Sequence, residues 1–321
     1  MSEAYVARML KALEGTEGLM LKRDFPLSRL TSIGTGGPAK LYVAVESMRA
    51  LRRLMGVIEK PYFVMGSGTN LLLSDRPFDG TIVRLGKAFG RIRLSGERIT
   101  AGAAARLGRL VDTAIEAAFP GFEELAGVPG SVGGAAAMNA GTHIVEIGDL
   151  VEKLVMVDTQ GTRREFSRDE LARGYRSPLA PAPGVVTSLS FVRGDGGDPA
   201  RQRERARELS EGRKIKHPWR ARTFGSTFKN PPGQIAARLI DSAGLKGTTV
   251  GGARVSPVHA NFIENHAGAT SRDIIELIQL VRARVSESSG VMLEPEVQLV
   301  GFTSSELSDL APYARTLAGE N

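Results

Sequence analysis

The segment at residues 225–231, GSTFKNP, brings together side chains that can bind an anion or move a proton. Ser226 carries a small hydroxyl beside the flexible Gly225, and Lys229 and Asn230 add an ammonium and an amide. From the residue types alone, Ser226 can be a turn residue, a phosphate ligand or a group that takes part in chemistry. The segment therefore indicates a candidate site without choosing among the three.

Two carboxylates lie close together in the segment LEPEV, residues 293–297. Glu294 and Glu296 are two residues apart, so in an extended strand their side chains lie on the same face. Neighbouring carboxylates perturb each other's pKa, and burial raises the pKa of a carboxyl group. The pattern allows one of them to be a functional acid and the other a salt-bridge partner.

A glycine-rich loop is expected at residues 66–75, GSGTNLLLSD, directly after the apolar run YFVM. Glycines let backbone N–H groups surround an anion, and Ser67, Thr69 and Asn70 add side-chain donors. The loop is neither a Walker loop nor a GxGxxG fingerprint. A tight turn between strands is the alternative interpretation.

A second glycine-rich segment, GVPGSVGGAAAMNAG, covers residues 127–141 and has almost no bulky side chains. Such a segment lets something flat or anionic lie against the backbone. A flexible linker is the alternative, although Val128, Val132 and Met138 favour an ordered loop.

The composition limits the possible chemistry. The 321 residues include no cysteine and four histidines, which excludes thiol nucleophiles and disfavours a metal site. The net charge of +7 favours anionic partners, yet the most basic segment, residues 201–222, is interpreted as a solvated helix face, and no nucleic-acid motif accompanies it. The amphipathic N-terminus and the lack of an 18-residue apolar run predict a cytoplasmic protein without membrane insertion.

The elements that must position these residues follow from the apolar periodicity. Amphipathic helices are expected over residues 47–60 and 106–119, among short strands. The run GDGGDP at 194–199 predicts a boundary, with Asp198 capping the following helix and Pro199 opening it. Beyond it, the strongest helix is expected over 269–290, with Thr270 and Asp273 as a capping box and Gly290 as its end. A long strand is expected over 291–302 and a polar peripheral tail over 303–321.

The ordered set of segments resembles the UDP-N-acetylenolpyruvoylglucosamine reductase family over about residues 25–302. Besides the four segments quoted above, the matching motifs are TSIGTGGPA at 31–39, YRSP at 175–178, GLKG at 244–247 and GGARVSPVHANFI at 251–263. One departure is Thr142-His143, where the family usually continues Ala-Tyr-Gly, so His143 is given no role.

The resemblance implies an α+β fold: an FAD-binding domain of the vanillyl-alcohol-oxidase type with two subdomains, and then a smaller α+β substrate-binding domain. The expected ranges are an N-terminal helix at 1–19, the FAD-binding domain at 20–195, the substrate-binding domain at 196–302 and the tail at 303–321. The compact spacing resembles the shorter subtype, which lacks an extra substrate-covering insertion. We expect a monomer that binds a UDP-sugar, and no nucleic acid.

The resemblance also implies the reaction: NADPH-dependent reduction of enolpyruvyl-UDP-N-acetylglucosamine to UDP-N-acetylmuramate, with FAD as cofactor. It makes Ser226 the proton donor, Arg176 the partner of the substrate carboxylate and Glu296 an acid at that carboxylate, with Glu294 as the alternative. Tyr175, Lys229 and Asn230 are expected to bind substrate, although Tyr175 and His259 can equally be packed structural residues. The expected cofactor-binding residues are Gly66, Ser67, Gly68, Thr69, Asn70, Gly130, Ser131, Gly133, Gly134 and Asn139.

Two other functions compete with this one. A different flavoenzyme on the same scaffold, such as an alcohol oxidase, typically has a larger substrate domain, and it leaves residues 225–231 and 293–297 unexplained. A non-enzymatic nucleotide-binding or nucleic-acid-binding protein fits the basic charge but gives the arginine, serine and glutamate motifs no task.

Overall fold

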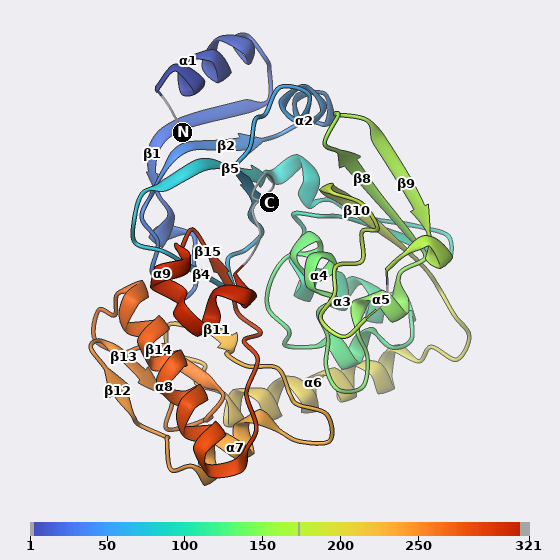
Figure 1. Ribbon diagram of the computed structural model, residues 1–321. Helices are drawn as coiled ribbons and strands as arrows, with labels where there is room; N and C mark the ends of the chain where they lie inside the picture. The colour runs from blue at the N-terminus through green and yellow to red at the C-terminus, as the bar shows by residue number, and fades with distance from the viewer. Residues whose placement is uncertain (1–2, 173, 315–321) are drawn as a thin grey trace. The chain divides into compact units, whose positions relative to one another are not determined.

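The computed structural model describes residues 3–172 and 174–314 (Figure 1). The chain forms two compact units, and each is assembled from separate stretches of sequence. Unit 1 comprises residues 1–22, 41–67 and 82–213; unit 2 comprises residues 23–40, 68–81 and 214–321. The contiguous ranges 20–195 and 196–302 expected from the sequence therefore differ from these units, because residues 23–40 and 68–81 belong with the C-terminal part.

The N-terminal elements are a helix, a four-stranded sheet and a second helix. The helices are α1 (Glu3–Ala12) and α2 (Met48–Met55), and the sheet order is β1-β2-β5-β3. Its strands are β1 (Leu19–Pro26), β2 (Pro38–Val45), β5 (Phe78–Leu85) and β3 (Tyr62–Val64). The Ser47 hydroxyl accepts a hydrogen bond from the Ala50 N–H at 3.1 Å and so caps α2. The helix then buries Leu51, Leu54 and Met55, as its apolar periodicity predicts.

Unit 1 also contains an antiparallel five-stranded sheet in the order β6-β7-β10-β8-β9. Its strands are β6 (Ile92–Ser95), β7 (Arg98–Gly102), β10 (Gly184–Val192), β8 (Lys153–Asp158) and β9 (Arg163–Ser167). The helices of this region are α3 (Leu107–Glu116), α4 (Val132–Met138) and α5 (Ile147–Leu150), and α4 packs against β10. Their apolar faces share one core with the sheet, which includes Leu110, Val132 and Phe191. This core fixes the second glycine-rich segment, so residues 127–141 are an ordered loop and helix and not a linker.

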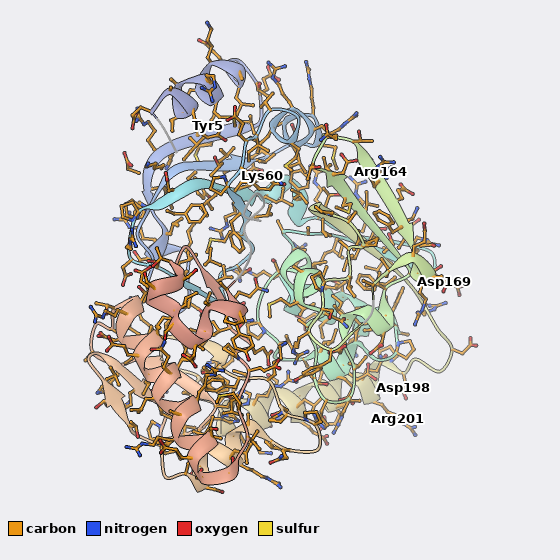
Figure 2. All side chains as sticks on the ribbon, in the orientation of Figure 1. Tyr5, Lys60, Arg164, Asp169, Asp198 and Arg201 are labelled. Carbon is orange, nitrogen blue, oxygen red and sulfur yellow. The ribbon has the colours of Figure 1, made fainter. Side chains whose placement is uncertain are left out.

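The basic helix α6 (Pro199–Lys216) begins as its sequence predicts. The Asp198 carboxylate accepts hydrogen bonds from the N–H groups of Ala200 at 2.9 Å and Arg201 at 3.3 Å. Figure 2 labels Asp198 and Arg201 at this end of the helix. Gln202 is the buried residue of α6, and its amide donates to the Phe119 carbonyl at 2.6 Å. The other residues of α6 are exposed or half-buried, so the solvated helix face expected over residues 201–222 is confirmed as far as Lys216, where the helix ends.

Unit 2 contains an antiparallel sheet in the order β11-β14-β13-β12, packed against the long helix α8 (Figure 1). Its strands are β11 (Thr223–Ser226), β14 (Phe262–Asn265), β13 (Ala253–Val255) and β12 (Thr249–Val250), and its helices include α7 (Ala236–Ser242) and α8 (Ser271–Ser289). The predicted capping box of α8 is confirmed, since Thr270 and Asp273 bond each other's backbone N–H groups at 2.9 and 3.1 Å. Gly290 ends the helix at φ 72°.

The strand predicted over 291–302 is much shorter than expected. Only β15 (Gln298–Val300) is a strand, and it pairs in parallel with β4 (Leu71–Leu73). Pro295 has no N–H to give to a ladder, and it forms only an isolated bridge with Phe228. The burial of alternate residues nevertheless persists through 293–297, so Glu294 and Glu296 point away from the core as their spacing predicts.

The C-terminal stretch is not peripheral over its described part, residues 303–314. It forms α9 (Ser304–Leu307) and the 3-10 helix η5 (Ser308–Tyr313). Leu307 and Leu310 are buried in the core of unit 2, and Arg282 of α8 makes an ion pair with Asp309 and donates to the Leu293 carbonyl at 2.8 Å. Leu307 and Leu310 are three residues apart and lie on one face of this segment. The segment is otherwise mainly polar, so its composition did not indicate a buried face. Residues 315–321 of the expected tail lie outside the described residues.

Candidate functional site

The first glycine-rich loop presents a run of backbone donors with no protein acceptor. The N–H groups of Gly66, Ser67, Gly68 and Thr69 donate to no acceptor among the described residues. Gly68 has φ 70°, and a left-handed residue within a run of N–H groups makes the concave arrangement that binds anions. The Gly68 carbonyl accepts a hydrogen bond from the Ser32 N–H at 3.0 Å, so the segment of residues 31–39 supports the conformation of the loop. A run of N–H donors of this kind can bind an anionic group.

Asn70 connects this loop to the segment of the two carboxylates. Its side-chain amide donates to the Glu296 carbonyl at 3.2 Å, and its own carbonyl accepts from the Gln298 N–H at 3.2 Å. Both contacts lie within unit 2. The position of Glu296 is therefore coupled to the conformation of the first loop.

In unit 1, Gly66 meets the second glycine-rich segment at very short range. A Cβ atom on Gly66 would lie 2.8 Å from the Ser131 hydroxyl oxygen and 3.6 Å from the Gly134 Cα. Ser131 is buried and caps α4, because its hydroxyl accepts from the Gly134 N–H at 3.2 Å. Gly133 is equally constrained, since a Cβ there would lie 2.8 Å from the Ala103 Cβ. Glycine is required at both positions because any side chain there would overlap a neighbouring residue.

Asn139 and Arg176, both predicted site residues of unit 1, are held by a third residue, Glu146. The Glu146 carboxylate accepts from the Arg176 guanidinium at 3.2 Å and from the Asn139 amide at 2.6 Å. Arg176 also donates to the carbonyls of Asn139 and Gly141, both at 3.3 Å. Arg176 has φ 58° and Asn139 φ 44°, an uncommon conformation for residues other than glycine. Glu146 was not among the predicted site residues, because it belongs to no recognisable motif in the sequence; the nearby His143 is exposed.

The outer face of this cluster is aromatic. Tyr175 is 50% exposed, and its ring lies 4.9 Å from the Arg176 guanidinium carbon. A cation against the face of an aromatic ring is attracted by the ring's quadrupole. Tyr175 is therefore not a packed core residue, and its ring is accessible to a ligand.

Ser226 ends β11 and is half-buried, opposite Phe262 of β14. Its hydroxyl makes no hydrogen bond with the residues that the structure describes. Gly225 has φ 87°, and a Cβ there would lie 4.0 Å from the Thr69 carbonyl oxygen. The Glu296 N–H donates to the Thr227 carbonyl at 2.8 Å. Unit 2 thus brings Ser226, Thr69 of the first loop and the Glu296 backbone into one neighbourhood.

Lys229 and Asn230 have protein partners in the same region. The Lys229 ammonium lies 3.5 Å from the Glu294 carboxylate, whose side chain is 56% exposed. The Asn230 side-chain oxygen accepts from the Ala236 N–H at 3.0 Å, at the start of α7, which leaves its amide nitrogen for a ligand. Glu294 is thus the salt-bridge partner that the two-carboxylate pattern allowed, and Glu296 is the more buried of the pair.

His259 is packed against other rings. Its ring centroid lies 4.8 Å from that of Phe262 and 5.1 Å from that of His217. Burial lowers the pKa of His259 below 6.5, and its Nδ1 accepts from the Asn261 N–H at 3.3 Å. A neutral imidazole with one nitrogen committed to the backbone fits the structural alternative.

Comparison with known proteins agrees with this picture. Residues 39–167 match a family described as an FAD-binding domain, and residues 217–300 match the C-terminal domain of UDP-N-acetylenolpyruvoylglucosamine reductase. In the described part of the chain, no group of three or more acidic, histidine or cysteine side chains is placed to hold a metal ion, and no helix could cross a membrane. The fold and the site thus define an FAD-binding oxidoreductase.

The particular family follows from full-length relatives. The chain is 42% identical to the UDP-N-acetylenolpyruvoylglucosamine reductase of Anaeromyxobacter dehalogenans strain 2CP-C, covering 91% of this chain and 89% of the relative. It is 41% identical to the reductase of Pelobacter propionicus, over 88% and 96%. The crystal structure of the Thermus caldophilus enzyme superimposes with a TM-score of 0.77 at 36% identity, covering 88% of this chain and 99% of that one. The chain belongs to the UDP-N-acetylenolpyruvoylglucosamine reductase family, whose enzymes serve peptidoglycan biosynthesis.

Proposed function

We propose that this protein reduces enolpyruvyl-UDP-N-acetylglucosamine to UDP-N-acetylmuramate with NADPH, as a cytoplasmic monomer of the shorter subtype. Residues 20–195 would serve the cofactor and residues 196–302 the substrate, with residues 1–19 and 303–321 outside both tasks. FAD, when bound, would supply the redox chemistry, namely hydride transfer from NADPH by way of its N5 to the β-carbon of the enolpyruvyl group. The chain's own residues bind the reactants and manage charge and protons.

The cofactor is held by the two glycine-rich segments. Gly66, Ser67, Gly68 and Thr69 offer unpaired N–H groups to its diphosphate. The second segment contributes a surface without side chains, from Gly130, Ser131, Gly133 and Gly134. Asn70 and Asn139 act by holding these segments, because their amides bond Glu296, Glu146 and the Gly148 N–H.

Charge develops on the substrate carboxylate when hydride reaches the β-carbon. Arg176 meets that carboxylate, because a guanidinium is always charged and grips two oxygens with parallel bonds. Glu296 acts at the same carboxylate as an acid that holds or delivers a proton. Together they stabilise the aci-carboxylate before the α-carbon is protonated.

Ser226 donates the proton to the α-carbon, and its oxygen regains one from water. The hydroxyl is not engaged by any described residue, so it is available to a substrate. Lys229 favours the transient alkoxide, although the Glu294 carboxylate 3.5 Å away offsets part of its charge. Asn230, Lys229 and Tyr175 bind other parts of the UDP-sugar.

The observation that carries the proposal is the Glu296 N–H bonded to the Thr227 carbonyl at 2.8 Å, directly after Ser226. It brings the Glu296 backbone next to the residue that follows Ser226 within one unit, which supports the two proposed roles at one site. An alcohol oxidase would leave this pairing without a task, as would a nucleic-acid-binding protein.

The test is an anaerobic assay of the two half-reactions. Purified protein should carry yellow flavin, NADPH should bleach it, and enolpyruvyl-UDP-N-acetylglucosamine should restore the colour. UDP-N-acetylglucosamine, which lacks the enolpyruvyl group, is the matched control and should not restore the colour. Protein without flavin, or reduced flavin that the enolpyruvyl substrate does not reoxidise, refutes the assignment.

A further inference from the structure

Asn139, Glu146 and Arg176 form a cluster in unit 1, and the proposed function gives Glu146 no direct role in the reaction. One carboxylate oxygen accepts from Arg176 at 3.2 Å, and the other accepts from Asn139 at 2.6 Å. Its side chain is 20% exposed and that of Arg176 is 13% exposed. An ion pair this sheltered holds its geometry better than a surface pair.

We propose that Glu146 is a positioning residue that fixes the guanidinium of Arg176 for the substrate carboxylate. This inference rests on the proposed function, which assigns Arg176 that task. Arginine has a long side chain with many rotamers, and binding a carboxylate through two parallel bonds requires a single orientation of the guanidinium plane. Glu146 and the carbonyls of Asn139 and Gly141 hold the group at three points before substrate arrives.

The backbone supports the same conclusion. Arg176 has φ 58°, a conformation that residues other than glycine keep only when the surroundings impose it. Asn139, at φ 44°, carries the carbonyl that Arg176 bonds, and its side chain bonds the Gly174 carbonyl at 3.1 Å. Glu146 therefore ties the 139–141 turn to the 174–176 turn.

The charge of Glu146 has two opposed effects. A carboxylate beside Arg176 weakens the electrostatic attraction that the guanidinium exerts on a substrate carboxylate. Its hydrogen bonds, however, fix the orientation, and a displacement of 1 Å at a reacting group can cost about a hundredfold in rate. We infer that orientation dominates, so removal of Glu146 should slow the reaction and not accelerate it.

Glutamine cannot fully replace this glutamate. The Asn139 side-chain oxygen accepts from the Gly148 N–H at 2.9 Å, which fixes the Asn139 NH2 group toward Glu146. A glutamine has one oxygen, so its own NH2 group would face either Asn139 or Arg176, both of which are donors. Glu146→Gln should therefore lie between the natural protein and Glu146→Ala.

The experiment compares Glu146→Ala, Arg176→Ala and the double variant in the two half-reactions of the FAD-loaded protein. Flavin reduction by NADPH should change less than reoxidation in all three, because Asn139 loses its bond to Glu146 but keeps those to the Gly148 N–H and the Gly174 carbonyl. Reoxidation by saturating enolpyruvyl substrate should fall about 10- to 100-fold in Glu146→Ala. The double variant should reoxidise no more slowly than Arg176→Ala, because Glu146 is proposed to affect the substrate carboxylate through Arg176.

A second readout needs no turnover. The affinity of the oxidised protein for UDP-N-acetylmuramate, which carries the product carboxylate, should fall several-fold in Glu146→Ala and Glu146→Gln. On the Arg176→Ala background, the same changes should leave that affinity unchanged. The control is Glu124→Ala, which breaks an ion pair of 2.9 Å with Arg205 in unit 1 and should change neither readout; Glu124 is as sheltered as Glu146, at 16% exposed, although Arg205 is 43% exposed.

The outcomes separate the two hypotheses. Substrate that fails to reoxidise the natural protein refutes the proposed function. If substrate reoxidises the natural protein and also reoxidises Glu146→Ala at the natural rate, the positioning role is refuted and the proposed function is not. Losses that multiply in the double variant also refute it, because they would show a structural effect independent of Arg176. A loss in Glu146→Ala that is absent on the Arg176→Ala background supports it.

Discussion

Gly66 gives a quantitative test of the contact between the two glycine-rich segments. In Gly66→Ala the new Cβ would lie 2.8 Å from the Ser131 hydroxyl oxygen, well inside ordinary contact. Gly66 does not have a left-handed φ, so the backbone itself accepts alanine and the clash alone sets the cost. Overpacking of this kind costs about 1–3 kcal/mol, and a displaced Ser131 also loses its cap of α4.

The second variant in the series removes the obstacle. Ser131→Ala alone should cost about 1 kcal/mol, because the Gly134 N–H loses its acceptor. In Gly66→Ala/Ser131→Ala the next atom is the Gly134 Cα at 3.6 Å, an ordinary contact. The double variant should therefore be about as stable as Ser131→Ala, with a coupling energy of about 1–3 kcal/mol.

The measurement is urea unfolding of the four proteins at one fixed excess of FAD, since bound cofactor adds to the apparent stability. The m-value should stay constant across the set if the variants change stability and not compactness. Two results would refute the reasoning: Gly66→Ala as stable as the natural protein, or a double variant whose loss equals the sum of the two single losses.

Three further predictions concern other parts of the molecule. Ser226→Ala should keep flavin reduction by NADPH but slow reoxidation by substrate at least about a hundredfold; a near-normal rate would reject Ser226 as proton donor. Because burial depresses the pKa of His259 below 6.5, the unfolded chain takes up its proton first, so stability should be steady at higher pH and fall as pH drops below about 6.5. His259→Phe should flatten that fall, and an unchanged pH slope in unfolding experiments would contradict this. Leu310→Ala should cost about 2–4 kcal/mol in urea unfolding because Leu310 is fully buried, whereas the exposed Leu10→Ala should change stability by less than about 0.5 kcal/mol.

Local signals in the sequence predicted local structure well. The capping residues Asp198 and Thr270 each mark the start of a helix, and Gly290 marks an end, because these residues satisfy backbone groups within a few positions. The buried face of α8 is likewise predicted by a local signal, the recurrence of apolar residues every three to four positions. The glycine content of residues 66–75 and 127–141 predicts that an anion or a flat group lies against their backbone, and this stays a prediction.

Features that depend on distant partners were not predictable in the same way. Pro295 shortened the expected strand, but only the pairing of β15 with β4 shows where pairing resumes. The division into two discontinuous units has the same origin, since no local pattern indicates that residues 68–81 belong with the C-terminal part. Glu146 had no sequence signal because its importance comes from two partners, one of them thirty positions away.

The pairing of β4 with β15 has a consequence for how the protein is made. β4 forms a two-stranded sheet with β15 alone, and the paired residues Leu71 and Gln298 are separated by most of the chain. At ribosomal rates of about 5–20 residues per second, β4 waits about 10–45 s for its partner after it emerges. Throughout that interval the nascent chain carries the bare apolar run LLL with an unpaired edge. Completion of unit 2 therefore has to wait until β15 has been synthesised.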